Sequence, residues 1–124
     1  MKTLLVSALL ASAVVVAVAA DSPSINGVWK VHSSIGGTEN DATCTLTQKE
    51  NLVTGTCTTE SGDATASGKV DGAKVIWSYD TDYNGTAITV KFNGTLDSAT
   101  NKIAGTVGVE QFGVDGDFTA TLSK

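Results

Sequence analysis

Arginine is absent from this chain of 124 residues, and basic residues of any kind are few. Eight lysines stand against thirteen aspartates and glutamates, so the formal net charge is -5 at pH 7. Proteins that recognise nucleic acids and other phosphate-rich polymers depend on arginine forks and basic patches. The composition therefore argues against a nucleic-acid partner, and the acidic balance is typical of a surface that keeps a protein soluble.

Catalytic side chains are also scarce. The chain has one histidine, His32, which the strand pattern assigns to an outer face, and two cysteines. No Ser-His-Asp set, zinc cluster, phosphate loop or dinucleotide fingerprint can be assembled from these residues. The acidic residues fall mostly at expected turns, which argues against the converging carboxylates of a glycosidase. We therefore expect a protein that is not an enzyme and that needs no cofactor.

The first twenty residues have the pattern of a secretory signal peptide. Lys2 precedes an uncharged apolar run from Leu4 to Val18, and small residues end the segment at Ala19 and Ala20. The apolar run is shorter than the roughly 20 residues that span a membrane, and no basic cluster follows it. We expect residues 1–20 to be removed, residues 21–124 to form a single domain without membrane insertion, and the mature protein to be secreted or periplasmic.

No sustained helical period follows Asp21, whereas period-two alternation recurs between turn signals. The pattern predicts an all-β fold of eight strands, at residues 26–33, 42–48, 53–59, 64–70, 73–81, 86–96, 102–108 and 116–123. Closing such a meander removes both exposed edges. We therefore expect an eight-stranded antiparallel up-and-down barrel. The alternative is a two-sheet β-sandwich, because the sequence does not show whether the last strand meets the first.

Each turn also predicts a register, because residues equidistant from a hairpin turn face each other. A turn at Asn84-Gly85 pairs Trp77 with Phe92, and Tyr79 with Val90, and places the large apolar residues of both strands on one face. A four-residue turn at 98–101 pairs Leu96 with Ile103 in the same way.

Two further turns also predict which residues face each other on neighbouring strands. A turn at Asp71-Gly72 pairs Ala66 with Trp77. A turn at Glu50-Asn51 places Cys44 opposite Cys57. An even cysteine count in an exported chain indicates disulfide pairing, so we expect these two to be bonded.

The segment Asp80-x-Asp82-x-Asn84-Gly85 matches the first half of an EF-hand calcium loop. The twelfth position of such a loop needs a bidentate glutamate, but Lys91 stands there, within a strand pattern. A plain hairpin turn is favoured over a looser calcium site, and the pair Asp115 and Asp117 is likewise expected in a solvated loop. We therefore expect no metal site.

Two short motifs resemble those of lipocalins and avidins. Gly27-x-Trp29 resembles the Gly-x-Trp that opens the first strand in both families, and Thr81-Asp82-Tyr83 resembles the second lipocalin motif. The arginine that lipocalins carry near the last strand has no counterpart. The resemblance to these calycin-like barrels implies a barrel architecture and, for the lipocalins, capture of a small apolar molecule inside it.

Five aromatic residues are patterned toward the interior and are the candidate ligand-binding set: Trp29, Trp77, Tyr79, Phe92 and Phe118. Small inward residues lie beside them, including Gly55, Gly68, Gly94 and Gly105. An eight-stranded barrel is just wide enough to be filled by side chains or to hold one small ligand. The rings and glycines favour a filled interior.

The expected function is non-catalytic binding of a small apolar molecule. The alternative is a filled barrel that contacts an unidentified macromolecule through its loops or outer face.

Overall fold

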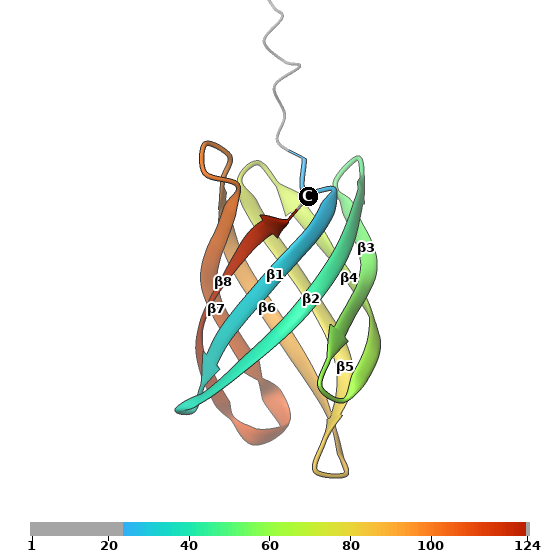
Figure 1. Cartoon of the computed structure of the whole chain (residues 1–124), viewed down its shortest axis with the longest axis vertical. Helices are drawn as coiled ribbons and strands as arrows, with labels where there is room; N and C mark the ends of the chain where they lie inside the picture. The colour runs from blue at the N-terminus through green and yellow to red at the C-terminus, as the bar shows by residue number, and fades with distance from the viewer. Residues whose placement is uncertain (1–23, 124) are drawn as a thin grey trace, which may run out of the picture.

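The computed structural model describes residues 24–123, which form a closed antiparallel β-barrel (Figure 1). The strands are β1 (Gly27–Ile35), β2 (Thr38–Lys49), β3 (Leu52–Thr59), β4 (Gly62–Asp71), β5 (Lys74–Tyr83), β6 (Thr86–Asp97), β7 (Lys102–Val109) and β8 (Val114–Ser123), with the 3-10 turn η2 (Glu110–Phe112) before β8. Each strand pairs with the next, and β8 pairs with β1. The predicted up-and-down barrel is confirmed, and this closing pair excludes the sandwich. The expected signal peptide, residues 1–20, lies outside the described residues.

Three of the four predicted registers are confirmed. Trp77 lies opposite Phe92, Leu96 opposite Ile103, and Cys44 opposite Cys57. At the β5–β6 turn, Asn84 and Gly85 have φ of 52° and 83°, the positive values that a type I′ hairpin needs. The predicted cysteine pairing is also confirmed, since a Cys44–Cys57 disulfide joins β2 to β3.

The fourth register, about Asp71-Gly72, is wrong. Asp71 pairs with Lys74, so the loop consists of Gly72 and Ala73, and Trp77 lies opposite Gly68 instead of Ala66. The error is a shift of two residues, which leaves the same side chains on the inner face, so hydrophobic alternation cannot detect it. Gly72, with φ of 62°, supplies the positive φ at the first loop position of the true hairpin.

One end of the barrel, which we call the closed end, carries the turns after β2, β4 and β6 together with both ends of the described chain (Figure 1). Ile25 lies across this end and is fully buried. Its carbonyl accepts a 2.9 Å hydrogen bond from Trp29 Nε1, and its backbone N–H donates to Gln48 Oε1 at 3.0 Å. These bonds satisfy the backbone N–H and carbonyl of Ile25 and hold this residue over the interior.

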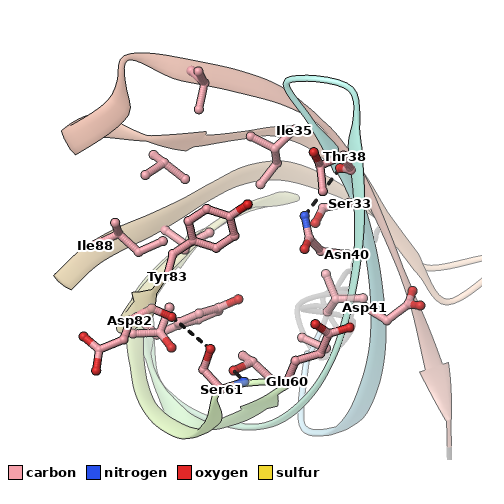
Figure 2. Close-up of a pocket in the computed structure, with 18 of the residues that line it drawn as sticks. Ser33, Ile35, Thr38, Asn40, Asp41, Glu60, Ser61, Asp82, Tyr83 and Ile88 are labelled. Carbon is pink, nitrogen blue, oxygen red and sulfur yellow. Dashed lines mark hydrogen bonds between the residues drawn. The ribbon is translucent and has the colours of Figure 1, made fainter. Parts of the chain in front are cut away.

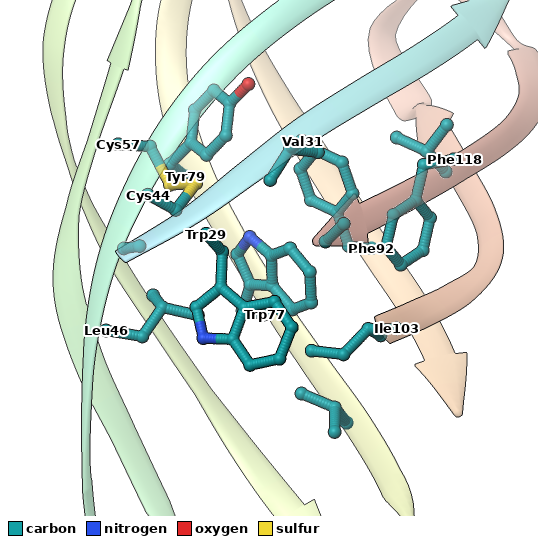
Figure 3. Packing of buried hydrophobic residues seen from close by; sticks show 14 of the residues in the cluster. Trp29, Val31, Cys44, Leu46, Cys57, Trp77, Tyr79, Phe92, Ile103 and Phe118 are labelled. Carbon is teal, nitrogen blue, oxygen red and sulfur yellow. A yellow bond between two sulfur atoms is a disulfide. The ribbon is translucent and has the colours of Figure 1, made fainter. Parts of the chain in front are cut away.

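Aromatic rings fill the middle of the barrel (Figure 3). Phe92 stacks on Trp77 with ring centroids 4.7 Å apart, and Phe118 meets both rings edge-on at 5.0 and 5.4 Å. Gly94 makes room for them, because a Cβ there would lie 2.8 Å from the tip of Phe118. The expected use of glycine beside inward rings is thus confirmed at this position, and this half of the interior is packed.

Candidate functional site

The other half of the barrel is hollow. A cavity of about 400 Å³ lies at the end formed by the β1–β2, β3–β4 and β5–β6 turns and by η2, which we call the open end (Figure 2). Its apolar wall consists of Val31, Ile35, Ile88, Val90, Val109 and Val114. The expectation of a filled interior is therefore corrected: the large rings pack in the middle of the barrel, whereas inward positions nearer the open end carry aliphatic side chains and polar ones such as Ser33, Thr38 and Asn40.

Two aromatic residues border both halves. Tyr79 and Phe92 line the cavity, with ring centroids 5.8 Å apart. Behind them the indole of Trp77 is fully buried, and its Nε1 has no hydrogen-bond partner within residues 24–123. Figure 3 shows this nitrogen at the edge of the ring that lies nearer to Tyr79. The inner boundary of the cavity is thus an aromatic layer held by the packed core.

Burial sets the ionisation of Tyr79. Loss of solvent around the phenol raises its pKa to about 12, because a phenolate would be poorly hydrated in this position. Tyr79 therefore presents a neutral hydroxyl to the cavity region at ordinary pH.

The mouth of the cavity carries exposed apolar side chains. Tyr83, at the end of β5, meets Phe112 of η2 with ring centroids 6.0 Å apart. The two residues are 49% and 45% exposed, and neighbouring Val114 is 36% exposed. Exposed apolar groups gathered around an opening are typical of a binding surface.

Polar contacts fix two of the surrounding turns. Ser61 Oγ donates a 2.9 Å hydrogen bond to the Asp82 carbonyl and so joins the β3–β4 turn to β5 (Figure 2). Gln111 Oε1 accepts the Thr89 backbone N–H at 3.0 Å and joins η2 to β6. The mouth is therefore braced by side chains from its own turns.

The structure separates the five predicted ligand residues. Tyr79 and Phe92 line the cavity, whereas Trp29, Trp77 and Phe118 lie in the packed half. Sequence reasoning missed most of the cavity wall, notably Ile88 and Val90, and also Tyr83 and Phe112 at the mouth. Alternation predicts which side chains point inward but does not compare their sizes along the barrel axis.

The candidate calcium segment forms a hairpin turn. Asp80 accepts a 2.7 Å hydrogen bond from the Thr89 hydroxyl on the neighbouring strand. Within residues 24–123, no group of three or more His, Cys, Asp or Glu side chains has an arrangement that could hold a metal ion.

His32 lies on the outer face, as predicted, and contacts two carboxylates. Its Nδ1 lies 2.7 Å from Asp41 Oδ1, and its Nε2 lies 2.6 Å from Glu39 Oε1. Hydrogen bonding to Asp41 and then to Glu39 raises the pKa of the imidazole. Hydrogen bonds from Ser34 and His32 lower the pKa of Glu39. With both ring nitrogens bonded to carboxylates, His32 has no free nitrogen to act as a base.

Neither the models of known protein families nor the sequences of curated proteins match this chain. Its class therefore follows from topology: a closed eight-stranded up-and-down β-barrel with a cavity at one end, an architecture consistent with a calycin-like fold. Within residues 24–123, no helix has the length and apolar character needed to cross a membrane.

Proposed function

We propose that this protein is a non-catalytic binding protein that holds one small, mainly apolar molecule in the cavity at its open end. The observation that carries the proposal is the cavity itself, about 400 Å³ in volume, with aliphatic walls and the aromatic boundary of Tyr79 and Phe92. Pockets for small molecules commonly have volumes of about 300–1,000 Å³ and are lined mainly by apolar and aromatic groups.

The distribution of exposed apolar residues supports a site at this end. Tyr83, Phe112 and Val114 are exposed near the mouth, whereas the other large exposed apolar residues of the described range, Leu52 and Ile76, lie on the outer face. Those two flank Lys69 on neighbouring strands, since Lys69 pairs with both. A charged residue thus interrupts the outer apolar surface, which favours a cavity ligand over a macromolecule docked on that face.

The disulfide supports export. Disulfides persist in oxidising compartments, so the Cys44–Cys57 bond is consistent with an extracellular or periplasmic protein. We propose that the first twenty residues direct export of the protein. Outside the cytoplasm it acts as a carrier or receptor.

Titration with the neutral apolar probe N-phenylnaphthylamine tests the function. We expect saturable enhancement of probe fluorescence by the folded protein. Ile88 lines the cavity, so Ile88→Trp puts a larger side chain into the space that the probe would occupy. This variant should weaken probe binding at least about ten-fold. The matched control is Ile76→Trp, because Ile76 is 46% exposed on the outside of β5, and this variant should bind as the parent does.

Circular dichroism checks that both variants fold. Absence of saturable binding by the parent protein, or equal binding by the two folded variants, would contradict the proposal.

A further inference from the structure

Acidic and basic residues divide between the two ends of the barrel. Of the twelve acidic residues within 24–123, only Glu50, Asp71 and Asp97 lie at the closed end, and the other nine lie in the half that holds the cavity. Four of the six lysines in this range lie at the closed end: Lys49, Lys69, Lys74 and Lys102. Lys30 and Lys91 are at mid-height on their strands. The open end is therefore strongly negative relative to the closed end.

Few of the open-end carboxylates have a cationic partner. Lys91 Nζ lies 2.8 Å from Glu110 Oε2, and His32 contacts Glu39 and Asp41. Within the described range, the other six form no ion pair: Glu60, Asp63, Asp80, Asp82, Asp115 and Asp117. A negative potential around an opening attracts cations to it and repels anions.

One of these carboxylates reaches the cavity. Glu60, in the β3–β4 turn, lines the opening, and Figure 2 shows its carboxylate turned toward the cavity, whereas those of Asp41 and Asp82 point away. Among residues 24–123, no lysine or histidine lines the cavity. An anionic head group would thus meet a carboxylate with no compensating cation, whereas an ammonium would find an ion-pair partner.

The aromatic residues add a second attraction for a cation. Tyr83 and Phe112 line the same opening as Glu60, and Tyr79 and Phe92 lie deeper in the same cavity. The faces of such rings attract ammonium groups, most strongly where water is partly excluded.

We propose that the preferred ligand is a cationic amphiphile, whose apolar body occupies the cavity while its ammonium group lies at the mouth beside Glu60. This inference rests on the proposed function and specifies the chemical class of the ligand. It excludes fatty acids and other apolar carboxylates as preferred ligands.

Three probes with the same apolar body test the head-group preference: decylamine, decanol and decanoate, titrated by calorimetry at about pH 7.5, where the amine is cationic and the acid anionic. We expect the amine to bind at least about ten-fold more tightly than the alcohol, and the alcohol more tightly than the acid. Raising sodium chloride from about 20 mM to about 300 mM should reduce the preference for the amine, because salt screens exposed charges.

Glu60→Gln should reduce amine affinity about five-fold or more and so lower the ratio of amine affinity to decanol affinity, because only the amine loses an ion-pair partner. The matched control Asp71→Asn removes the same charge at the closed end. It should leave the ratio of decylamine affinity to decanol affinity unaltered. Decanoate or decanol binding as tightly as the amine would overturn the cationic preference and leave the binding function standing. Failure of all three probes to bind would overturn both.

Discussion

Three isoleucines provide a direct test of the division between a packed half and a hollow half. Ile103 is fully buried in the core, Ile88 is 7% exposed in the cavity wall, and Ile76 is 46% exposed on the outer face. Replacing each with alanine removes the same three carbon atoms. Their contributions to stability should differ only because their surroundings differ.

The expected cost of Ile103→Ala is about 3–5 kcal/mol. Loss of three buried carbons accounts for about 2.4 kcal/mol at roughly 0.8 kcal/mol each. The space left behind adds the remainder, since a packed core relaxes only partly. Ile88→Ala should cost about 1–2 kcal/mol, because the cavity side of this residue has no protein atoms whose contacts can be lost. Ile76→Ala should change stability by less than about 0.5 kcal/mol.

Urea unfolding followed by far-ultraviolet circular dichroism and tryptophan emission measures all three changes. Thermal melting should rank the variants in the same order, with Ile103→Ala and Ile88→Ala separated by roughly 8–16 °C for a difference near 2 kcal/mol. Losses for these two variants that agree within about 0.5 kcal/mol would refute the argument, because they would show that the two halves of the interior are packed alike.

Three further outcomes are expected. Replacing Cys44 and Cys57 together with alanine should lower the free energy of unfolding by about 3 kcal/mol, measured by urea unfolding, since the bond closes a loop with a sequence separation of 13; an unchanged midpoint would contradict this. His32 should titrate above its ordinary pKa of 6.5 in a nuclear magnetic resonance experiment, and the stability that it contributes should be present below that value and lost as the pH rises through the raised pKa. Glu39 has a lowered pKa, so the stability that it contributes should be lost as the pH falls through its pKa in the folded protein. The pH dependence of stability from both groups should shrink in His32→Gln. A titration midpoint of His32 at or below 6.5 would show that its carboxylate contacts do not form. Thermal melts with calcium at about 5 mM and with a chelator should overlay, and a reproducible rise of several degrees with calcium would reveal a metal site.

Most of the fold could be predicted because turn chemistry and alternation constrain it jointly. Asn84-Gly85 fixes the register of β5 and β6, and apolar residues then fall on one face of both strands. Barrel closure follows from the cost of leaving two edges unpaired. The register about Gly72 could not be obtained from alternation, because a shift of two residues keeps the same face inward.

The cavity could be predicted only in part. Aromatic content identified Tyr79 and Phe92, but it selected Trp29, Trp77 and Phe118 equally, because all five point inward. Hollow space depends on the summed size of inward residues at each height in the barrel. Ordering the inward residues by their distance from the turns would have placed the large rings in the middle of the barrel, with aliphatic and polar side chains toward the open end.

The pairing of β8 with β1 has a consequence for the order of assembly. Val28 pairs with Ser123, so the seam of the barrel joins residues from opposite ends of the described chain. Pairings between such distant residues form late in folding. The chain must first lose the conformational entropy of the long loop between them, and only then do the contacts stabilise the fold. Val31 of β1 and Val114 of β8 both line the cavity. The wall of the cavity is therefore incomplete until β8 has paired with β1, so the cavity can take its final form only in the last step of barrel closure.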